Sequence, residues 1–256
     1  MTKCLNCYKT ISEEASYCPS CGAGVVTERI TLNKIISDVA ETIFGWDNKY
    51  FFTLRSLILR PHLVLEDYVS GVRKRYVPPF TFLVIGATLM LFTFTFFLDG
   101  FMEDLKAFNI QLVERYKGFG VKDLDLERVD QVQAQILKYF NLVTLLLMPL
   151  YALFTYIIYH KTYNYAEHLV FNAYVQGTGL VISLIVFYLS LITHPVVFAI
   201  ITLTTWSLHA YIFGKLYRLG AGVSILKLFF FQVMLFISIT LILALTVLVV
   251  ILKAYL

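Results

Sequence analysis

The chain has 256 residues, of which 59% are hydrophobic and only 15% are charged, and its formal net charge is +4. Soluble globular domains carry about 25% charged residues, so this composition excludes an ordinary soluble enzyme and favours an integral membrane protein. Residues 1–24 hold no apolar run of the length that a cleavable signal peptide requires. We therefore expect a membrane protein without such a peptide.

The N-terminal segment contains two Cys-x-x-Cys pairs, Cys4 with Cys7 and Cys18 with Cys21. Each pair can form a tight turn that points two thiolates at one ion, and two such turns complete the tetrahedral four-sulfur shell that zinc prefers. We predict a structural zinc site in a ribbon over residues 1–25 that folds only with its metal. Four free thiols in an unstructured tail are the alternative. A redox pair would need a strand–helix context that the flanking sequence lacks, and four sulfur ligands leave no open position for zinc catalysis.

Residues 26–79 form the second predicted segment. Apolar positions from Leu32 to Phe44 recur at helical spacing, which predicts a short amphipathic helix with Thr31 as its cap. The apolar run from Tyr50 to Leu59 is too short to span a bilayer and is expected to lie in the cytoplasmic interface. The two helices are interpreted as membrane-surface helices or as a packing layer on the cytoplasmic face of the bundle, and these readings are compatible.

A basic segment precedes the first predicted span. It brings three consecutive cations to the membrane, and such a cluster attracts anionic headgroups by about 1 kcal/mol per charge. The alternative is an orientation signal without a specific ligand. The predicted lipid-headgroup or partner-binding residues are Arg60, Arg73, Lys74, Arg75 and Tyr76.

Several short motifs carry a resemblance to a known family. They are the C-x2-C and C-P-x-C-G pairs, Arg29-x-Thr31-Leu32, Thr53-x3-Leu57 with Pro61, Tyr68-x2-Gly71-x-Arg73-x2-Tyr76-x2-Pro79, and Glu167–Phe171. With them the chain resembles an uncharacterised bacterial family of zinc-ribbon membrane proteins, catalogued as a domain of unknown function. One departure is Gly71-Val72-Arg73-Lys74, where that family usually has glycine followed directly by two basic residues. The resemblance implies an architecture and supplies no activity.

The remainder, residues 80–256, is predicted to be an all-α transmembrane domain. A helix needs roughly 20 apolar residues to cross a bilayer. Five runs approach or exceed that length, at 80–98, 140–159, 169–192, 195–213 and 226–252. The fold class is therefore an all-α polytopic membrane protein of about five transmembrane helices with a small N-terminal zinc ribbon.

The distribution of Lys and Arg predicts the orientation. Five cations precede the first run, and Lys161, Lys215 and Arg218 occupy the later loops of the same side. The positive-inside rule then places the N-terminus in the cytoplasm, and an odd number of spans places the C-terminus outside. We expect a multi-pass protein of the bacterial cytoplasmic (inner) membrane.

The loop over 99–139 is long and has two helical stripes separated by a glycine-containing stretch. This pattern predicts an αα-hairpin on the outer side. It is interpreted as a stalk for partner docking or dimerisation, or as a hairpin that folds over the bundle.

Polar residues inside the membrane are costly and mark candidate functional positions. The predicted intramembrane polar cluster comprises Glu167, His168, Asn172, Gln176 and His209, of which Glu167, His168 and His209 are the catalytic candidates. A hydrogen-bonded packing network is the alternative. Gly177 and Gly179 lack the strand–turn–helix context of a phosphate loop and are expected to permit close helix packing.

Two classes of function follow. The first is a non-catalytic membrane organiser or adaptor, whose zinc ribbon and interfacial helices contact a cytosolic protein or anionic lipid and whose helices anchor it and could form a homo-oligomer. The second is a transporter or membrane-embedded enzyme for a lipid or solute that uses the polar face around Glu167, His168 and His209. Residues 1–50 hold five basic and six acidic residues, so no nucleic-acid partner is expected.

Overall fold

The computed structural model describes residues 2–4, 6–12, 15–22, 49–116, 126–159 and 162–255, with the side chains of Asn141 and of residues 242–255 excepted. The chain divides into two compact units, Met1–Asn48 and Lys49–Leu256. The predicted amphipathic helix at Leu32–Phe44 lies outside the described residues.

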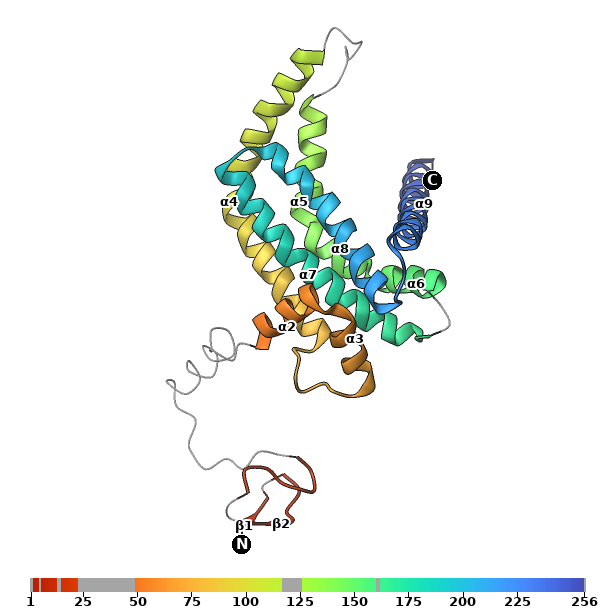
Figure 1. The fold of residues 1–256 in the computed structure, drawn as a ribbon. Helices are drawn as coiled ribbons and strands as arrows, with labels where there is room; N and C mark the ends of the chain where they lie inside the picture. The colour runs from red at the N-terminus through yellow and green to blue at the C-terminus, as the bar shows by residue number, and fades with distance from the viewer. Residues whose placement is uncertain are drawn as a thin grey trace. The chain divides into compact units, whose positions relative to one another are not determined.

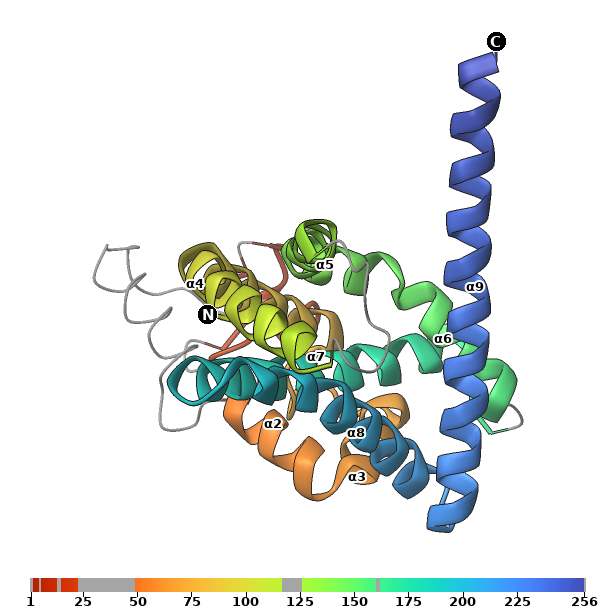
Figure 2. The same ribbon diagram turned by 90° about the horizontal axis from the view of Figure 1, so that it is seen from above.

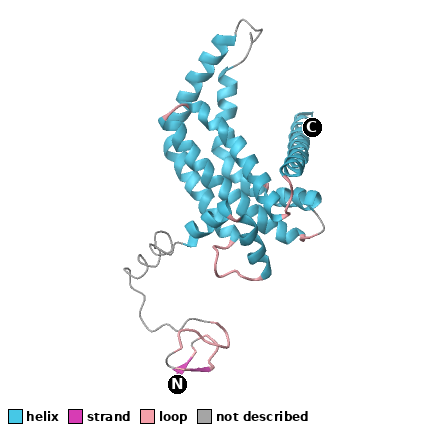
Figure 3. Cartoon of the chain, viewed as in Figure 1, coloured by secondary structure: helices cyan, strands magenta, loops and turns pink. Residues whose placement is uncertain are grey.

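The first unit contains two short strands and the cysteines. Strand β1 (Thr2–Lys3) pairs antiparallel with β2 (Thr10–Ile11), so that Thr2 faces Ile11 and Lys3 faces Thr10 (Figure 3). The small interior of this unit consists of Cys4, Ile11 and Cys18, with Cys7 packed against them. One isoleucine among thiols cannot offset the chain entropy of folding, so the described residues of this unit depend on something other than a hydrophobic core of their own.

The second unit is helical throughout its described secondary structure (Figure 1). Proline and glycine set several boundaries: Pro61 occupies the first turn of α3, and Gly71 ends that helix in the left-handed region at φ 111°. The elements are α2 (Lys49–Leu59), α3 (Pro61–Ser70), α4 (Pro79–Tyr116), α5 (Leu126–Leu146), α6 (Met148–Tyr159), α7 (Tyr165–Ile192), the 3₁₀ helix η2 (Pro195–Ala199), α8 (Ile200–Leu216) and α9 (Ala221–Tyr255).

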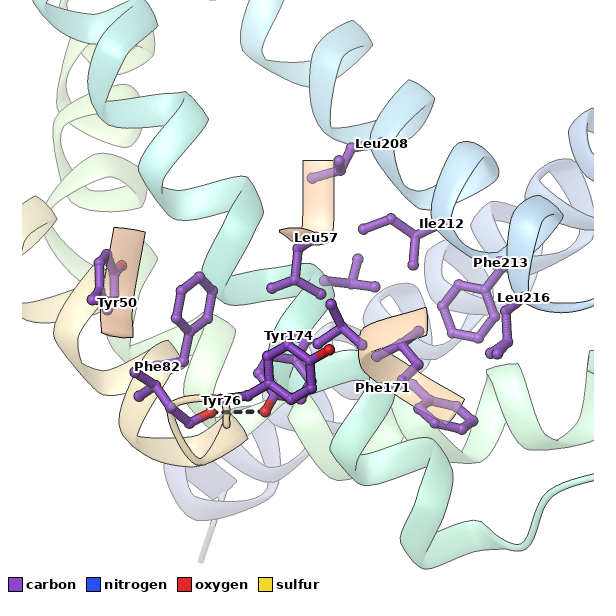
Figure 4. Close-up of a cluster of buried hydrophobic side chains, with 14 of the residues drawn as sticks. Tyr50, Leu57, Tyr76, Phe82, Phe171, Tyr174, Leu208, Ile212, Phe213 and Leu216 are labelled. Atoms are coloured by element: carbon purple, nitrogen blue, oxygen red, sulfur yellow. Dashed lines mark hydrogen bonds between the residues drawn. The ribbon is translucent and has the colours of Figure 1, made fainter. Parts of the chain in front are cut away.

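Helix α7 lies at the centre of the bundle (Figure 2). It packs against α4, α6 and α8, and at one end also against α2 and α3. Buried aromatic residues fill this end, among them Phe82, Phe171 and Tyr174 (Figure 4). The fully buried Tyr174 hydroxyl donates a hydrogen bond of 2.7 Å to the carbonyl of Val77, just before α4 begins. The short helices α2 and α3 thus cap one end of the bundle.

Helices α4 and α7 approach each other closely at Gly177. A Cβ atom at this position would lie 2.6 Å from Cδ1 of Phe82 and 3.2 Å from Cα of Leu83. On the facing helix, a Cβ atom at Gly86 would lie 3.3 Å from the Gly177 carbonyl oxygen. The close packing expected at Gly177 is therefore present, and it requires the absence of a side chain there.

In the described part of the chain, four helices are long and apolar enough to cross a membrane, and they mark the chain as a multi-pass membrane protein. The count of about five spans is not confirmed. The run over 140–159 does not form one helix: α5 ends at Leu146 and α6 begins at Met148. Pro149 explains the break, because it has no N–H to donate and its ring crowds the carbonyl of residue 145. The candidate spans are Pro79–Tyr116, Tyr165–Ile192, Pro195–Leu216 and, within the described residues, Ala221–Leu241.

Helices α4 and α5 extend together beyond the rest of the bundle (Figure 1). The 38 residues of α4 span about 57 Å at 1.5 Å per residue, against a hydrocarbon core of about 30 Å. Across the pair, Asn109 Nδ2 donates to Asp130 Oδ1 at 3.0 Å and to Gln133 Oε1 at 3.2 Å. The tip between the two helices, residues 117–125, lies outside the described part of the chain.

Candidate metal centre and buried polar groups

The four N-terminal cysteines come together as their spacing predicts. Their sulfur atoms all lie within 4.8 Å of one another. The Sγ–Sγ distances are 3.7 Å for Cys4 and Cys21 and 3.6 Å for Cys7 and Cys18. A disulfide would need about 2.05 Å. A zinc–sulfur bond of about 2.3 Å implies a tetrahedral edge of about 3.8 Å, so this donor set fits a single metal ion.

Two equivalent turns hold these cysteines. In the first, the N–H of Tyr8 donates to the carbonyl of Cys4 at 2.8 Å, and in the second the N–H of Gly22 donates to the carbonyl of Cys18 at the same distance. The residue after each pair adopts a positive φ, 59° at Tyr8 and 72° at Gly22. This conformation is free of steric penalty for glycine, but it costs a residue with a side chain about 1–2 kcal/mol. Tyr8 therefore occupies a glycine-type position at a cost in stability.

The backbone of the first turn favours a thiolate at one ligand. The N–H groups of Cys7 and Asn6 point at Cys4 Sγ and lower the pKa of that thiol. The N–H of Lys9 lowers the pKa of Cys7, but the Cys21 thiol and burial outweigh it and raise that pKa to about 12. Four thiolates at this spacing thus need a cation among them, which is the condition that a soft divalent metal satisfies.

Two tyrosines flank the cysteines without contributing to the interior. Tyr8 is 75% exposed and Tyr17 is 69% exposed, whereas Cys4 and Cys18 are buried. Exposed aromatic side chains are enriched where proteins bind other proteins. A tetrahedral ion held by all four sulfurs would have its coordination shell filled, so the arrangement could fix a surface but would leave no metal position for a substrate.

The predicted intramembrane cluster does not form one site. Glu167 completes a capping box at the start of α7: the N–H of Asn164 donates to Glu167 Oε2 at 2.6 Å, and the N–H of Glu167 donates to Asn164 Oδ1 at 3.0 Å. This is a structural use of the carboxylate, since it satisfies backbone donors that the helix start leaves free.

His168 and Asn172 belong to one buried hydrogen-bond network, in which Asn172 Oδ1 has no partner among the described residues. His168 is fully buried, with Nδ1 at 3.1 Å from Thr155 Oγ1 and Nε2 at 3.1 Å from the Tyr217 hydroxyl. Asn172 Nδ2 donates to Thr155 Oγ1 at 2.7 Å, while Thr155 Oγ1 donates to the carbonyl of Tyr151 at 3.0 Å. The single hydroxyl proton is then used, so His168 carries its proton on Nδ1 and accepts from Tyr217 through Nε2.

His209 and Gln176 lie elsewhere, on a separate intramembrane cavity of about 220 Å³ formed by α7, α8 and α9 with contributions from α5 and α6. Ser183 lines the same cavity. Among the described residues, His209 Nε2 and Ser183 Oγ are buried without a hydrogen-bond partner. The imidazole is stacked on Phe213, with ring centroids 4.7 Å apart, and lies 4.5 Å from the Phe231 ring. Two residues that line the cavity therefore each carry a buried polar atom without a partner.

Three residues of the buried polar groups were not predicted from the sequence: Ser183, Thr155 and Tyr217. Ser183 follows Gln176 by seven residues and so shares its helix face, a signal that was available. Thr155 is a polar residue within an apolar run, which is a weaker signal. Tyr217 lies just beyond α8, and nothing in the sequence places its hydroxyl against a histidine 49 residues away.

Some residues of the basic segment make contacts within the protein. Arg75 lies 4.0 Å from Asp67 and over the Phe52 ring, and Arg73 lies over the Tyr68 ring. Tyr76 is only 3% exposed and donates from its hydroxyl to Asp67 Oδ2 at 2.8 Å. Burial, followed by this carboxylate, raises the pKa of Tyr76. Tyr76 is thus placed as a packing residue, whereas Arg60, Arg73, Lys74 and Arg75 remain exposed.

Comparison with known proteins gives one match. A family described as "Protein of unknown function (DUF3667)" matches residues 47–91, a stretch that contains α2, α3, the basic segment and the start of α4. No curated protein and no solved structure matches the chain. The matched stretch thus coincides with the helical cap and its basic segment, and it carries no assigned activity.

Proposed function

We propose that this protein is a membrane-anchored adaptor that recruits a cytosolic protein through its N-terminal metal module. The observation that carries the proposal is Tyr8, a 75% exposed aromatic residue held at φ 59°. The equivalent position of the second turn is glycine. A backbone outlier of this kind is kept where the side chain serves a function that outweighs its cost. Tyr8 and Tyr17 together form the proposed docking face.

Zinc is the ion proposed for the module, because four thiolates are its preferred structural shell and the donor spacing suits its bond length. Its role is to stabilise the docking face, since residues 1–25 have almost no core of their own. The turn that begins at Cys4 and the turn that begins at Cys18 would each supply two ligands.

The proposed topology keeps five crossings and a cytoplasmic N-terminus in a bacterial inner membrane. Helices α4 and α7 run in the same direction, because Phe82 lies near Tyr174 and Phe94 and Phe101 contact Phe187 further along both helices. The chain between them must therefore return, and α5 with α6 supplies that crossing in two pieces. An odd number of crossings then carries α9 and the C-terminus to the outer side.

The proposal assigns roles to the remaining parts. The exposed cations Arg60, Arg73, Lys74 and Arg75 favour anionic lipid at the cytoplasmic surface. The α4–α5 hairpin would be the surface for a second copy or an outer partner. Nothing in the proposal requires catalysis or nucleic acid.

A photo-crosslinking experiment tests the adaptor function. A photoreactive phenylalanine replaces Tyr17 in the full chain, expressed in the native membrane. We expect a discrete adduct with one cytosolic protein, which is lost in Tyr8→Gly although this variant keeps its metal and relieves the strained φ. A probe at Lys106, an exposed residue of α4, is the matched control.

The result that contradicts the proposal is equally definite. If the adduct persists in Tyr8→Gly and in Cys4→Ser/Cys21→Ser, the metal module does not determine what the protein binds.

A second candidate function, handling of a small solute, is favoured by the cavity that holds His209 and Ser183. Ser183→Leu fills this cavity with apolar atoms. Ser238→Leu is its control, because Ser238 is a half-buried residue of α9 that does not line the cavity. If the cavity serves a solute, the Ser183→Leu variant no longer complements a strain that lacks the gene, although its thermal stability is unchanged. Full complementation by Ser183→Leu would dismiss this candidate.

A further inference from the structure

A second cavity lies where α3, α8 and the start of α9 meet, outside the sites described above. Its volume is about 730 Å³, within the range of about 300–1,000 Å³ typical of small-molecule sites. The residues that matter for its chemistry are His62, Tyr211, Lys215, Arg218, Ala221 and Ile225.

The charged side chains of this cavity are both cationic. Lys215 and Arg218 are exposed, and among the described residues no carboxylate lies within 4.0 Å of either. Glu66 and Glu167 both raise the pKa of Tyr163, and Arg218 lowers it. Within the described part of the protein, neither cation of the cavity is therefore directly paired with a carboxylate.

A third group points to an anionic ligand. His62 lines the cavity, and its Nδ1 atom is buried without a hydrogen-bond partner among the described residues. A buried nitrogen without a partner costs free energy unless a ligand or water satisfies it. An acceptor oxygen from a bound anion would meet this need, because neutral or charged imidazole can donate from this atom.

The backbone at the start of α9 adds to the positive potential of the cavity. Helix α9 begins at Ala221, which lines the cavity, so the free N–H groups of its first turn face the region of Lys215 and Arg218. Gly220 and Gly222 on either side have no atom within 4 Å of a Cβ position, which leaves this backbone accessible. A helix start of this kind attracts negative charge, and here it adds to the two cations.

We propose that this cavity binds a phosphate-bearing anion. Two cations, an imidazole donor and accessible backbone N–H groups are the donors that recognise phosphate oxygens. The volume exceeds that of inorganic phosphate, and the apolar Leu219 and Ile225 on the lining give the remainder of the ligand an apolar contact. The chemistry is that of a phospholipid headgroup or of a soluble phosphate ester, and the site is independent of the proposed adaptor function.

The test uses the full-length protein and two independent kinds of variant. Lys215→Ala/Arg218→Ala removes the cations, and Lys106→Ala/Arg115→Ala removes the same charge from exposed positions of α4. Ala221→Asp introduces a carboxylate into the cavity at a helix start where it supports folding, and Ala221→Asn is its uncharged isostere. Each variant is exchanged into nanodiscs of phosphatidylcholine with phosphatidylglycerol, and retained lipid is quantified by native mass spectrometry.

At about 1 kcal/mol per charge, the cavity double variant should bind phosphatidylglycerol about 30-fold more weakly. Ala221→Asp should weaken binding about fivefold, while Ala221→Asn and the α4 control stay within about twofold of the parent protein. A calorimetric titration in uncharged detergent with inorganic phosphate alone forms the second arm.

The two arms separate the sources of the phosphate group. Variant-sensitive retention of the lipid without a response to phosphate assigns a headgroup, and a variant-sensitive response to phosphate without lipid retention assigns a soluble ester. If neither the lipid nor phosphate distinguishes the folded cavity variants from their controls, the proposal is overturned.

Discussion

Thr155 Oγ1 is the meeting point of the buried network, because His168 and Asn172 both depend on it. Replacement by valine keeps the shape of the side chain but leaves His168 Nδ1 without an acceptor and Asn172 Nδ2 with only the His168 carbonyl. Hydrogen bonds inside membrane proteins contribute about 0.6–2 kcal/mol each, so we expect Thr155→Val to lose about 1–2 kcal/mol of unfolding free energy.

The measurement for this first prediction is thermal unfolding in mild detergent. Thr88→Val is the matched control, because Thr88 is exposed and its hydroxyl donates only to the Val84 carbonyl of its own helix. Equal melting temperatures for both variants would show that the network contributes nothing to stability.

Gly177 gives a second prediction at the level of one residue. A methyl group there meets the Phe82 ring at 2.6 Å and the Leu83 backbone at 3.2 Å, so α4 and α7 must separate. Overpacking of this kind costs about 1–3 kcal/mol, and we expect Gly177→Ala to lower the melting temperature. Gly100→Ala, in an open part of α4, should raise it slightly because alanine favours a helix by about 1 kcal/mol over glycine.

At the residue scale, sequence spacing predicts contacts within one turn and fails across helices. The cysteine cluster was predictable because two short turns determine it. The grouping of Glu167 with His168, Asn172, Gln176 and His209 assumed one shared face, but a helix has several neighbours. Glu167 caps its own helix. His168 and His209 share one aromatic neighbour, Phe213, but their ring nitrogens do not meet: those of His168 lie against Thr155 and Tyr217, whereas Nε2 of His209 has no partner among the described residues.

At the level of elements, the start of α7 is fixed by the reciprocal contacts of Asn164 and Glu167. A glutamine can replace glutamate in a capping box, whereas alanine cannot. We therefore expect Glu167→Gln to retain the stability of the parent and Glu167→Ala to lose about 0.5–2 kcal/mol.

This third prediction also separates structure from chemistry. Thermal unfolding and complementation are measured on both variants. A glutamine variant that is stable but inactive would show that the charge of Glu167 serves the function, and would contradict its assignment as a helix cap.

The break between α5 and α6 shows where hydropathy alone is insufficient. The mean hydropathy of residues 140–159 predicts one span. Hydropathy values contain no information on backbone hydrogen bonding, so they do not reveal that Pro149 lacks an N–H. The α6 fragment of 12 residues reaches only about 18 Å, short of the hydrocarbon core of about 30 Å. Long apolar helices such as α7 and α9 were predictable because neither contains a proline.

At the level of the whole molecule, the metal ligands all belong to the first compact unit. A chelator should therefore unfold residues 1–25 and leave the helices of the second unit intact. We expect loss of bound zinc and rapid proteolysis near Lys9, with unchanged far-ultraviolet circular dichroism and melting temperature. Cys18→Ser/Cys21→Ser should reproduce this state without chelator.

The opposite outcome of this fourth prediction is also informative. A fall in the melting temperature of the helical unit on chelation would show that the metal module supports the bundle, and the two units would then not be independent in stability.

The central position of α7 has a consequence for how the chain is made. Helices α2, α3 and α4 leave the ribosome before α7, yet the segment just before α4 is held by the buried Tyr174 hydroxyl of α7, which donates to the Val77 carbonyl. Until synthesis passes residue 192, the earlier helices therefore lack this contact, and Phe82, which stacks on Tyr50 of α2, lacks its second aromatic neighbour Tyr174. Insertion of this protein is thus completed by its middle helix, and a chain interrupted before Tyr165 would hold the cap helices without the surface on which they close.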